Sequence, residues 1–282
     1  MNVIRRHYFI NNNINNIASG SIVIIVMVAL ITPYFTPYKD PEGWNYVPRD
    51  RPPSLQYLFG TNTLGQDVFW ITIYSLRNSI QIGVIAALIG LSISLFVGVL
   101  AGLQKGLFSE VFTAIIDTFN LIPVFPILIL VAVMWKQYLN VALVAIIIGS
   151  LGWGWAARII RSMILSLKNR IFIQTAHFSG YKLHSMIFYQ FMPYMLGWIV
   201  MAFLALFNMA IGLEAALGLI GLTSLEKASI GSTIFWSLSY QAFLRGIWWW
   251  FVFPTIFIVV LMVAIYTIAN NVRRSLVGGG TI

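Results

Sequence analysis

The chain contains no cysteine among its 282 residues. Disulfide bonds, thiolate metal sites and cysteine nucleophiles are therefore excluded. Charged residues are also scarce, at 9% of the chain, whereas a soluble domain carries about 25%. With so few charges the chain cannot cover a surface that faces water on all sides. The sequence therefore predicts an integral membrane protein.

The sequence also lacks the residue patterns of several kinds of enzyme and carrier. No GxxxxGK[ST] segment is present, so we expect no P-loop for ATP. His177 and His184 have no carboxylate close by in the sequence, which does not favour a metal site. Paired carboxylates within the apolar runs, expected of a proton-driven carrier, are missing. Asp117 looks embedded near an apolar run, either as a proton relay or as a paired group.

These absences predict no catalytic residue, cofactor or metal in this chain. The energy for directional transport would then come from a partner protein. A self-sufficient carrier or channel, and an integral membrane enzyme, stay open as alternative functions at this point.

Hydrophobic residues make up 59% of the chain, and its mean hydropathy is +0.86. A helix of about 20 apolar residues crosses the hydrocarbon core of about 30 Å. Runs of this kind predict an all-α membrane protein with six transmembrane helices, at residues 18–35, 80–103, 112–135, 141–160, 194–217 and 248–268. Pro123 and Pro126 are expected to kink the third helix. Close helix packing is expected at the small residues Gly90, Gly98, Gly149 and Gly152.

A long polar segment rich in proline separates the first two apolar runs, from residue 36 to about residue 78. Asn62 or Thr63 is placed to cap a short helix that begins near Leu64, and we expect this helix to lie along the membrane surface. The sequence therefore divides into residues 1–79, with the first helix, an extracytoplasmic loop and the surface helix, and residues 80–282. The second part is a core of five helices with a cytoplasmic loop at about 162–193.

Basic residues predict the direction in which the chain crosses the membrane, because cytoplasmic loops are rich in Lys and Arg. One set of loops and helix ends carries ten basic residues against Glu110 and Asp117, a sum of +8: Arg5, Arg6, Lys105, Arg158, Arg161, Lys168, Arg170, Lys182, Arg273 and Arg274. The other set sums to +1, and together they give the net charge of +9. Both termini and the loop before Pro193 are therefore expected in the cytoplasm. Charge spread over short loops does not favour nucleic acid as a partner.

The segment from Arg158 to Pro193 is the longest polar interruption in the second half of the chain, and it contains no acidic residue. Gly180 divides it into two pieces compatible with helix, since glycine suits the left-handed turn that ends a helix. The second piece is amphipathic. It could lie on anionic lipid or insert into a soluble motor subunit, and the residues alone favour neither.

The same segment resembles the EAA signature of ATP-binding cassette (ABC) importer permeases. That signature reads E-A-A, three residues, G, nine residues, I, any residue and L-P, and its spacing matches here from Gln174 through Gly180 to Pro193. The departures are Gln174 for Glu, Thr175 for Ala, Gln190 for Ile and Met192 for Leu. The change at Gln174 removes one charged contact that the resemblance implies with the motor subunit.

Further stretches resemble the dipeptide/oligopeptide permease family, in its second-permease type. They are FGTNTLGQDVF at 59–69, IYSLRNS at 73–79, the approach to the EAA segment at 157–168, EAALGLIGL at 214–222 and SIG at 229–231. Together they cover residues 59–235 in the family's order. The resemblance implies the type I ABC-importer permease fold and import of di- or oligopeptides. Similar permeases also import oligosaccharides and other small solutes, which stay open as substrates.

The resemblance also implies partners and site residues. The partners are a second homologous permease, two cytoplasmic ATPase subunits that hold ATP and Mg, and an extracytoplasmic substrate-binding protein, in the cell membrane of a prokaryote. The contact with the ATPases would be made by Gln174, Thr175, Ala176 and Gly180, flanked by Tyr181, Lys182 and Leu183. The outer gate, or the docking surface for the binding protein, would include Asp67, Arg77, Glu214, Gly221 and Gly231.

Overall fold

The structure is a computed structural model that describes residues 31–178, 182–223 and 227–278. The regular secondary structure of these residues is helical, and loops and an isolated bridge between Thr61 and Asp67 make up the rest. The elements are η1 (Thr32–Phe35), α2 (Val68–Leu103), α3 (Leu107–Leu121), α4 (Val124–Met134), η2 (Lys136–Tyr138), α5 (Val141–Leu151), α6 (Gly154–Lys168), α7 (Ile171–Phe178), α8 (Leu183–Met186), the π-turn η3 (Ile187–Phe191), α9 (Met192–Leu219), α10 (Ile230–Ser239) and α11 (Trp249–Gly278).

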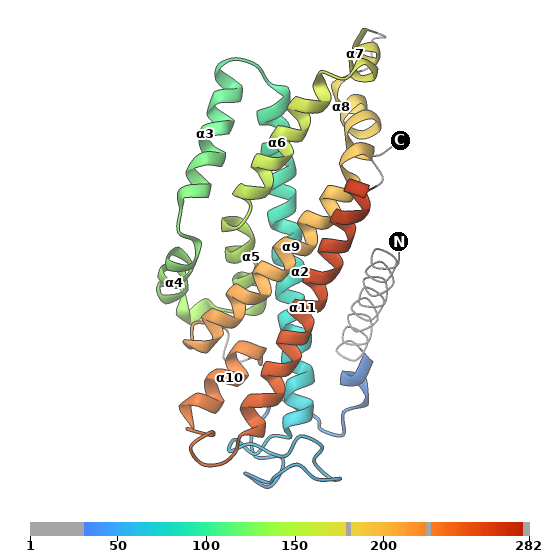
Figure 1. The fold of residues 1–282 in the computed structure, drawn as a ribbon. Helices are drawn as coiled ribbons and strands as arrows, with labels where there is room; N and C mark the ends of the chain where they lie inside the picture. The colour runs from blue at the N-terminus through green and yellow to red at the C-terminus, as the bar shows by residue number, and fades with distance from the viewer. Residues whose placement is uncertain (1–30, 179–181, 224–226, 279–282) are drawn as a thin grey trace, which may run out of the picture.

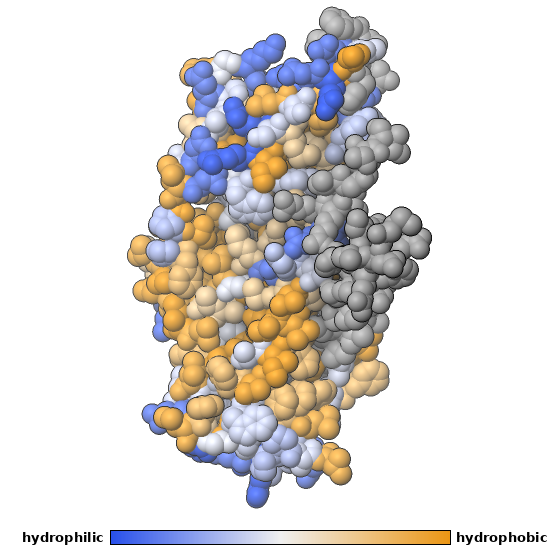
Figure 2. Space-filling model, viewed as in Figure 1, coloured by the Kyte–Doolittle hydropathy of each residue, from blue (hydrophilic) through white to orange (hydrophobic). Residues whose placement is uncertain are grey.

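The helices bear out a membrane protein with several spans. Three of them are long and apolar enough to cross a membrane, or up to five if each of two bent helix pairs is one span. The expected first span, 18–35, lies outside the described residues except for its last turn in η1. Figure 2 shows hydrophobic residues over the middle of the molecule and hydrophilic residues gathered towards its two ends, as expected for a chain that crosses a bilayer.

Helix α2 corrects the expectation of a separate surface helix. It is continuous over 36 residues and therefore about 54 Å long, well beyond the ~30 Å hydrocarbon core. The boundary expected after residue 79 falls inside it. The polar side chains near that boundary, such as Ser75 and Ser79, are buried against other helices and do not face water. The helix is capped by Asp67, whose Oδ1 accepts from Phe69 N at 2.9 Å, and not by Asn62 or Thr63.

The third and fourth expected spans are each broken in two. Helices α3 and α4 meet at an angle of 81° at Pro123, which confirms the expected kink there. Pro126 lies in the first turn of α4, where its missing N–H disturbs no helical hydrogen bond. Helices α5 and α6 meet at 46° around Gly152, and α6 runs on to Lys168, beyond the expected end at Ile160.

Close helix packing at the expected glycines is confirmed. A Cβ added to Gly98 of α2 would lie 2.7 Å from the carbonyl oxygen of Ala157. A Cβ added to Gly149 of α5 would lie 2.6 Å from that of Ala86. Backbones can approach this closely only where no side chain stands between them, so α2 forms the centre of the bundle against α5 and α6.

Two groups of elements lie at opposite ends of the molecule. Figure 1 shows α7 and α8 at one end, and α10 with the loop of residues 36–67 at the other. Helix α10 was not expected from the sequence, because it is short and carries Ser and Thr among its apolar residues. The long helices α2, α9 and α11 connect the two ends, so a movement at one end has a rigid path to the other.

Candidate functional site

Helix α7 is anchored to the bundle by its inward face. Ile173 is only 3% exposed and packs in a cluster with Ile160 and Ile164 of α6. Met186 at the end of α8 and Phe191 of η3 are buried in the same cluster. A displacement of α7 would therefore be transmitted to α6 and, through η3, to the start of α9.

The opposite side of this segment faces outward. Gln174 and Thr175 of α7 are exposed, and Lys182 before α8 is exposed as well. The Thr175 hydroxyl donates to the carbonyl oxygen of Ile171 at 3.0 Å, within its own helix. The segment thus presents polar side chains on one side and an apolar anchor on the other.

Basic residues surround this end of the bundle. Lys168 Nζ donates to the carbonyl oxygens of Gly102 at 3.2 Å and Leu103 at 3.0 Å, so it satisfies the C-terminal end of α2 from α6. Arg158 pairs with Asp117 at 2.7 Å, and both side chains are about half exposed. This pairing gives Asp117 a structural partner and does not favour a proton relay. An open hollow of about 550 Å³ lies beside α7, lined by Leu167, Asn169, Arg170, Ile171 and Tyr194.

A second group of polar residues meets near the other end of the bundle. Glu214 of α9 is fully buried, at 0% exposed. Its Oε2 accepts from Ser79 of α2 at 3.0 Å, and its Oε1 accepts from Thr223 at 3.4 Å. The Ser79 oxygen accepts in turn from Ile230 N at 3.1 Å. A single hydroxyl therefore links α2, α9 and the first turn of α10.

Helix α10 is held to α2 at neighbouring points. The hydroxyls of Ser75 and Thr233 are 2.6 Å apart. Asn78 donates to the carbonyl oxygen of Ala228 at 2.7 Å. Ser75, Asn78 and Ser79 share one face of α2 at spacings of three and four residues. We call the contacts made by Ser75, Asn78, Ser79, Glu214 and Thr233 the polar seam.

Glycines bring the backbones of α9 and α10 together beside the polar seam. A Cβ added to Gly231 would lie 2.8 Å from the carbonyl oxygen of Ala215 and 2.9 Å from Gly218 Cα. Gly221 ends α9 with a φ of 72°, a left-handed conformation that glycine adopts without strain. Leu222 N donates back to the carbonyl oxygen of Leu217 at 2.9 Å, which closes the helix end.

Comparison with known proteins supplies the family. Residues 94–277 match the model of the family described as binding-protein-dependent transport system inner membrane component. The chain belongs to this family. The permease is 30% identical to the oligopeptide transport system permease protein OppC of Bacillus subtilis, over 95% of the chain and 86% of that protein. It is 28% identical to the dipeptide transport system permease protein DppC of the same organism, over 93% of the chain and 82% of that protein.

Solved structures agree on the fold. The permease superposes on a chain of the MetNI methionine ABC transporter, solved in inward-facing conformations, with a TM-score of 0.59 at 17% identity. The match covers 74% of this chain and 97% of that chain. The protein is therefore a membrane permease subunit of an ABC importer, of the dipeptide/oligopeptide type, and ATP hydrolysis lies in separate subunits.

The expected coupling residues of the permease fall into three groups. Gln174, Thr175 and Lys182 are exposed at the end of the molecule where α7 lies. Ala176 belongs to α7, and Leu183 is the first residue of α8. The remaining two, Gly180 and Tyr181, lie outside the described residues.

The expected outer residues are only partly brought together. Glu214, Gly221 and Gly231 lie at or beside the polar seam and are buried. Asp67 lies at the start of α2, about three turns before Ser79. Burial raises the pKa of Asp67, and Tyr38 donates to its Oδ2 at 3.4 Å. Arg77 is half-buried on α2.

Sequence reasoning missed Glu42 and the polar face of α2. Glu42 Oε1 accepts from Asn78 Nδ2 at 3.0 Å and from Ala228 N at 2.8 Å, and its Oε2 pairs with Lys227 at 3.0 Å. Glu42 thereby ties the loop of residues 36–67 to the polar seam. The signal in the sequence was the spacing of Ser75, Asn78 and Ser79, which places three polar side chains on one face of an apolar helix.

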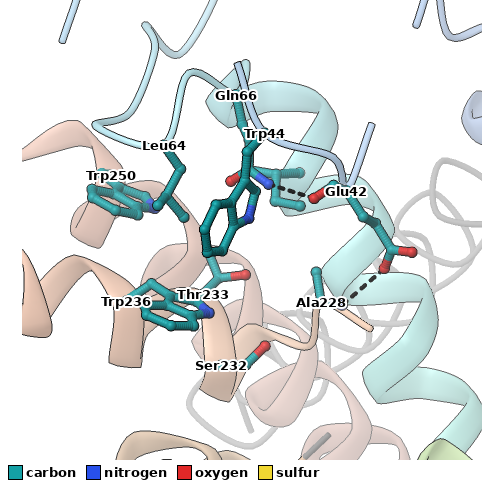
Figure 3. Close-up of a pocket in the computed structure, with 10 residues that line it drawn as sticks. Glu42, Trp44, Leu64, Gln66, Ala228, Ser232, Thr233, Trp236 and Trp250 are labelled. Carbon is teal, nitrogen blue, oxygen red and sulfur yellow. Dashed lines mark hydrogen bonds between the residues drawn. The ribbon is translucent and has the colours of Figure 1, made fainter. Parts of the chain in front are cut away.

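A small cavity lies beside Glu42 at this end of the permease (Figure 3). Its volume is about 30 Å³, and its lining includes Trp44, Trp236 and Trp250. Gln66 Nε2 donates to the backbone carbonyl oxygen of Glu42 at 2.7 Å, a hydrogen bond drawn as a dashed line in Figure 3. Pockets for small molecules measure about 300–1,000 Å³. This cavity is therefore too small to hold a transported solute in the conformation seen here.

Proposed function

We propose that this permease forms, with a second homologous permease subunit, the path by which di- or oligopeptides enter a prokaryotic cell. Two cytoplasmic ATPase subunits would drive it, and an extracytoplasmic binding protein would deliver the peptide. The family match carries this proposal, and OppC and DppC, whose names specify oligopeptide and dipeptide transport, supply the substrate class.

The segment α7–α8 is the proposed coupling contact with the ATPases. Its members are Gln174, Thr175, Ala176, Gly180, Tyr181, Lys182 and Leu183. ATP binding would draw the ATPases together and displace α7, and Ile173 would pass that displacement to α6 and α9 as a rigid-body movement. The buried anchor at Ile173 beside exposed Gln174 and Thr175 supports this role.

The charges near α7 support a cytoplasmic position for this end. Figure 1 shows that α3, α6, α7 and α8 reach this end. These elements and the loops beside them carry Lys105, Arg158, Arg161, Lys168, Arg170 and Lys182 against Glu110 and Asp117, and such an excess of basic residues is typical of cytoplasmic loops. With six transmembrane helices, the first of them at 18–35, both termini would lie in the cytoplasm. The loop of residues 36–67 and α10 would then face the outside.

The outer residues take different proposed roles because their burial differs. Glu214, Gly221 and Gly231 are buried, so they would shape the outer gate and not contact the binding protein directly. Asp67 and Arg77 would support the docking surface through α2 and the loop before it.

Reconstitution tests the proposed function. The permease, its partner permease, the two ATPases and the binding protein would be placed in liposomes, and entry of a labelled tripeptide would be measured. We expect uptake only when ATP is inside the vesicles and the binding protein outside. Uptake by this chain alone without ATP would identify a self-sufficient carrier. ATP-driven uptake of an oligosaccharide but not of peptides would overturn the substrate class.

A further inference from the structure

The polar seam is unusual for its surroundings. It involves two helices that are long and apolar enough to cross a membrane, α2 and α9, yet it brings together a carboxylate, an amide and several hydroxyls. Glu214, Ser75 and Ser79 are each 0% exposed. Polar groups inside a membrane protein are retained only where protein partners satisfy them.

Each member of the polar seam has its partner on another element. Ser79 satisfies Glu214 of α9 and the backbone N–H of Ile230 in α10 at once. Ser75 satisfies Thr233, and Asn78 satisfies the carbonyl of Ala228. Movement of α10 away from α2 would break three contacts together, those of Ser75 with Thr233, Asn78 with Ala228 and Ser79 with Ile230 N. It would leave buried hydroxyls and the N-terminus of α10 without these partners, which is costly. Glu214 acts on α10 through Ser79, because it accepts from the Ser79 hydroxyl and leaves the Ser79 oxygen to accept from Ile230 N.

The glycine contact between α9 and α10 also holds α10 in place. Gly218 and Gly231 allow α9 and α10 to touch through their backbones, and a Cβ on either would meet backbone atoms at 2.8 Å or less. Such a close contact fits one arrangement of the two helices, because packed backbones do not deform continuously. Glu42 adds the loop of residues 36–67 to the same group through Asn78 and Ala228.

We propose that α2, α9 and α10 move as one rigid unit through the transport cycle, and that Glu214 is the positioning residue that keeps α10 within it. The proposal rests on the proposed ATP-driven import, whichever solute is carried. Outward access would then open along the boundary between this unit and the second permease, and not between α10 and α2.

A disulfide across the polar seam tests the rigid unit. The chain has no native cysteine, and the Ser75 and Thr233 oxygens are 2.6 Å apart, so the double substitution Ser75→Cys, Thr233→Cys places two thiols within bonding reach. We expect the oxidised pair to retain uptake within about twofold of the reduced pair, a difference of under about 0.5 kcal/mol. The controls are Ser75→Cys alone and the unsubstituted chain, each treated with the same oxidant.

Three outcomes decide the proposal. Retained uptake with the disulfide formed supports it. Loss of uptake on oxidation, recovered on reduction, would show that α10 leaves α2 during the cycle. Failure of the thiols to join in the assembled complex would contradict the geometry of the seam itself. If the unsubstituted complex shows no ATP-driven uptake, the proposed function itself is wrong. This result is distinct from a loss of uptake that appears only on oxidation of the double variant.

The role of Glu214 is tested by rescue. We expect Glu214→Leu to lower the solute taken up per ATP hydrolysed about fivefold or more, as for a lost coupling between sites. Glu214→Gln keeps an oxygen that accepts from Ser79, so it should retain most of that ratio. The disulfide between positions 75 and 233 should restore the ratio in Glu214→Leu, because it replaces the seam covalently. Wild-type coupling in Glu214→Leu, or no rescue by the disulfide, would overturn the positioning role.

Discussion

The backbone contact between α9 and α10 gives a prediction that can be worked out from distances. The substitution is Gly218→Ala, near the end of α9. Its Cβ would lie 2.5 Å from Gly231 Cα, 2.6 Å from Gly231 C and 2.9 Å from Ser232 N. All three are backbone atoms of α10, so no side chain can rotate to make room. To reach an ordinary carbon–carbon separation of about 3.5 Å, the helices must part by about 1 Å.

The expected magnitude follows from two opposing terms. Overpacking against atoms that cannot yield costs about 1–3 kcal/mol, while Ala in place of Gly recovers at most about 1 kcal/mol of helix propensity. Taking the middle of the first range, about 2 kcal/mol, the net loss is about 1–2 kcal/mol. Because the polar seam lies beside this contact, its hydrogen bonds would lengthen as well. The variant should lower the apparent melting temperature by about 2–4 °C for each kcal/mol lost.

A matched control lies on the same helix. In Gly212→Ala the added Cβ meets only Met262 Cε at 3.3 Å, the end of a flexible side chain that can move away. We expect this variant to be as stable as the wild type or slightly more stable. The assay is thermal unfolding of the purified complex in detergent. Equal melting temperatures for the Gly218 and Gly212 variants would refute the reasoning.

Variants at three further positions test other contacts. Asp67→Ala should cost about 1 kcal/mol of stability by removing the cap of α2, whereas Asp67→Asn keeps the cap. Since burial raises the pKa of Asp67, the wild type loses stability as pH rises through that pKa. The melting temperature of Asp67→Asn relative to the wild type should therefore rise over the same pH range. Asp117→Ala breaks only a half-exposed pair with Arg158 and should change stability by less than about 1 kcal/mol in the same assay, a larger loss being contrary to that view. Ile173→Ala removes the anchor of α7 and should lower solute uptake more than ATP hydrolysis in proteoliposomes; an equal fall in both would indicate lost assembly instead.

Much of the fold could be predicted because apolar runs and prolines act locally. The runs at 80–103 and 194–217 lie within α2 and α9, and the run at 248–268 lies within α11 except for its first residue. Pro123 breaks the third span where its ring forbids a straight helix. The surface helix was wrong because periodicity near residue 68 does not reveal whether a polar side chain meets water or another helix. Ser79 meets Glu214, 135 positions away in the sequence.

The candidate site, too, has a part that local sequence could predict and a part that depends on contacts between distant helices. The proposed coupling segment could be located from spacing within one stretch, and its contact with the ATPases stays a prediction; Gln174 and Thr175 are exposed in the structure. The polar seam depends on three helices that are distant in sequence, so no local pattern could show that Ser75 meets Thr233. Glu42 was missed for the same reason, since its partners lie on α2 and beside α10.

The central claim is that α7 contacts the ATPase subunits in the cytoplasm. The absence of native cysteine allows a photoactivated cross-linker to be attached at one chosen position. The two positions are Gln174→Cys on α7 and Leu55→Cys, a fully exposed residue in the loop of residues 36–67. Illumination of the assembled complex should join the position 174 variant to an ATPase subunit and the position 55 variant to none. A cross-link to the ATPase from position 55, or none from position 174, would contradict the account.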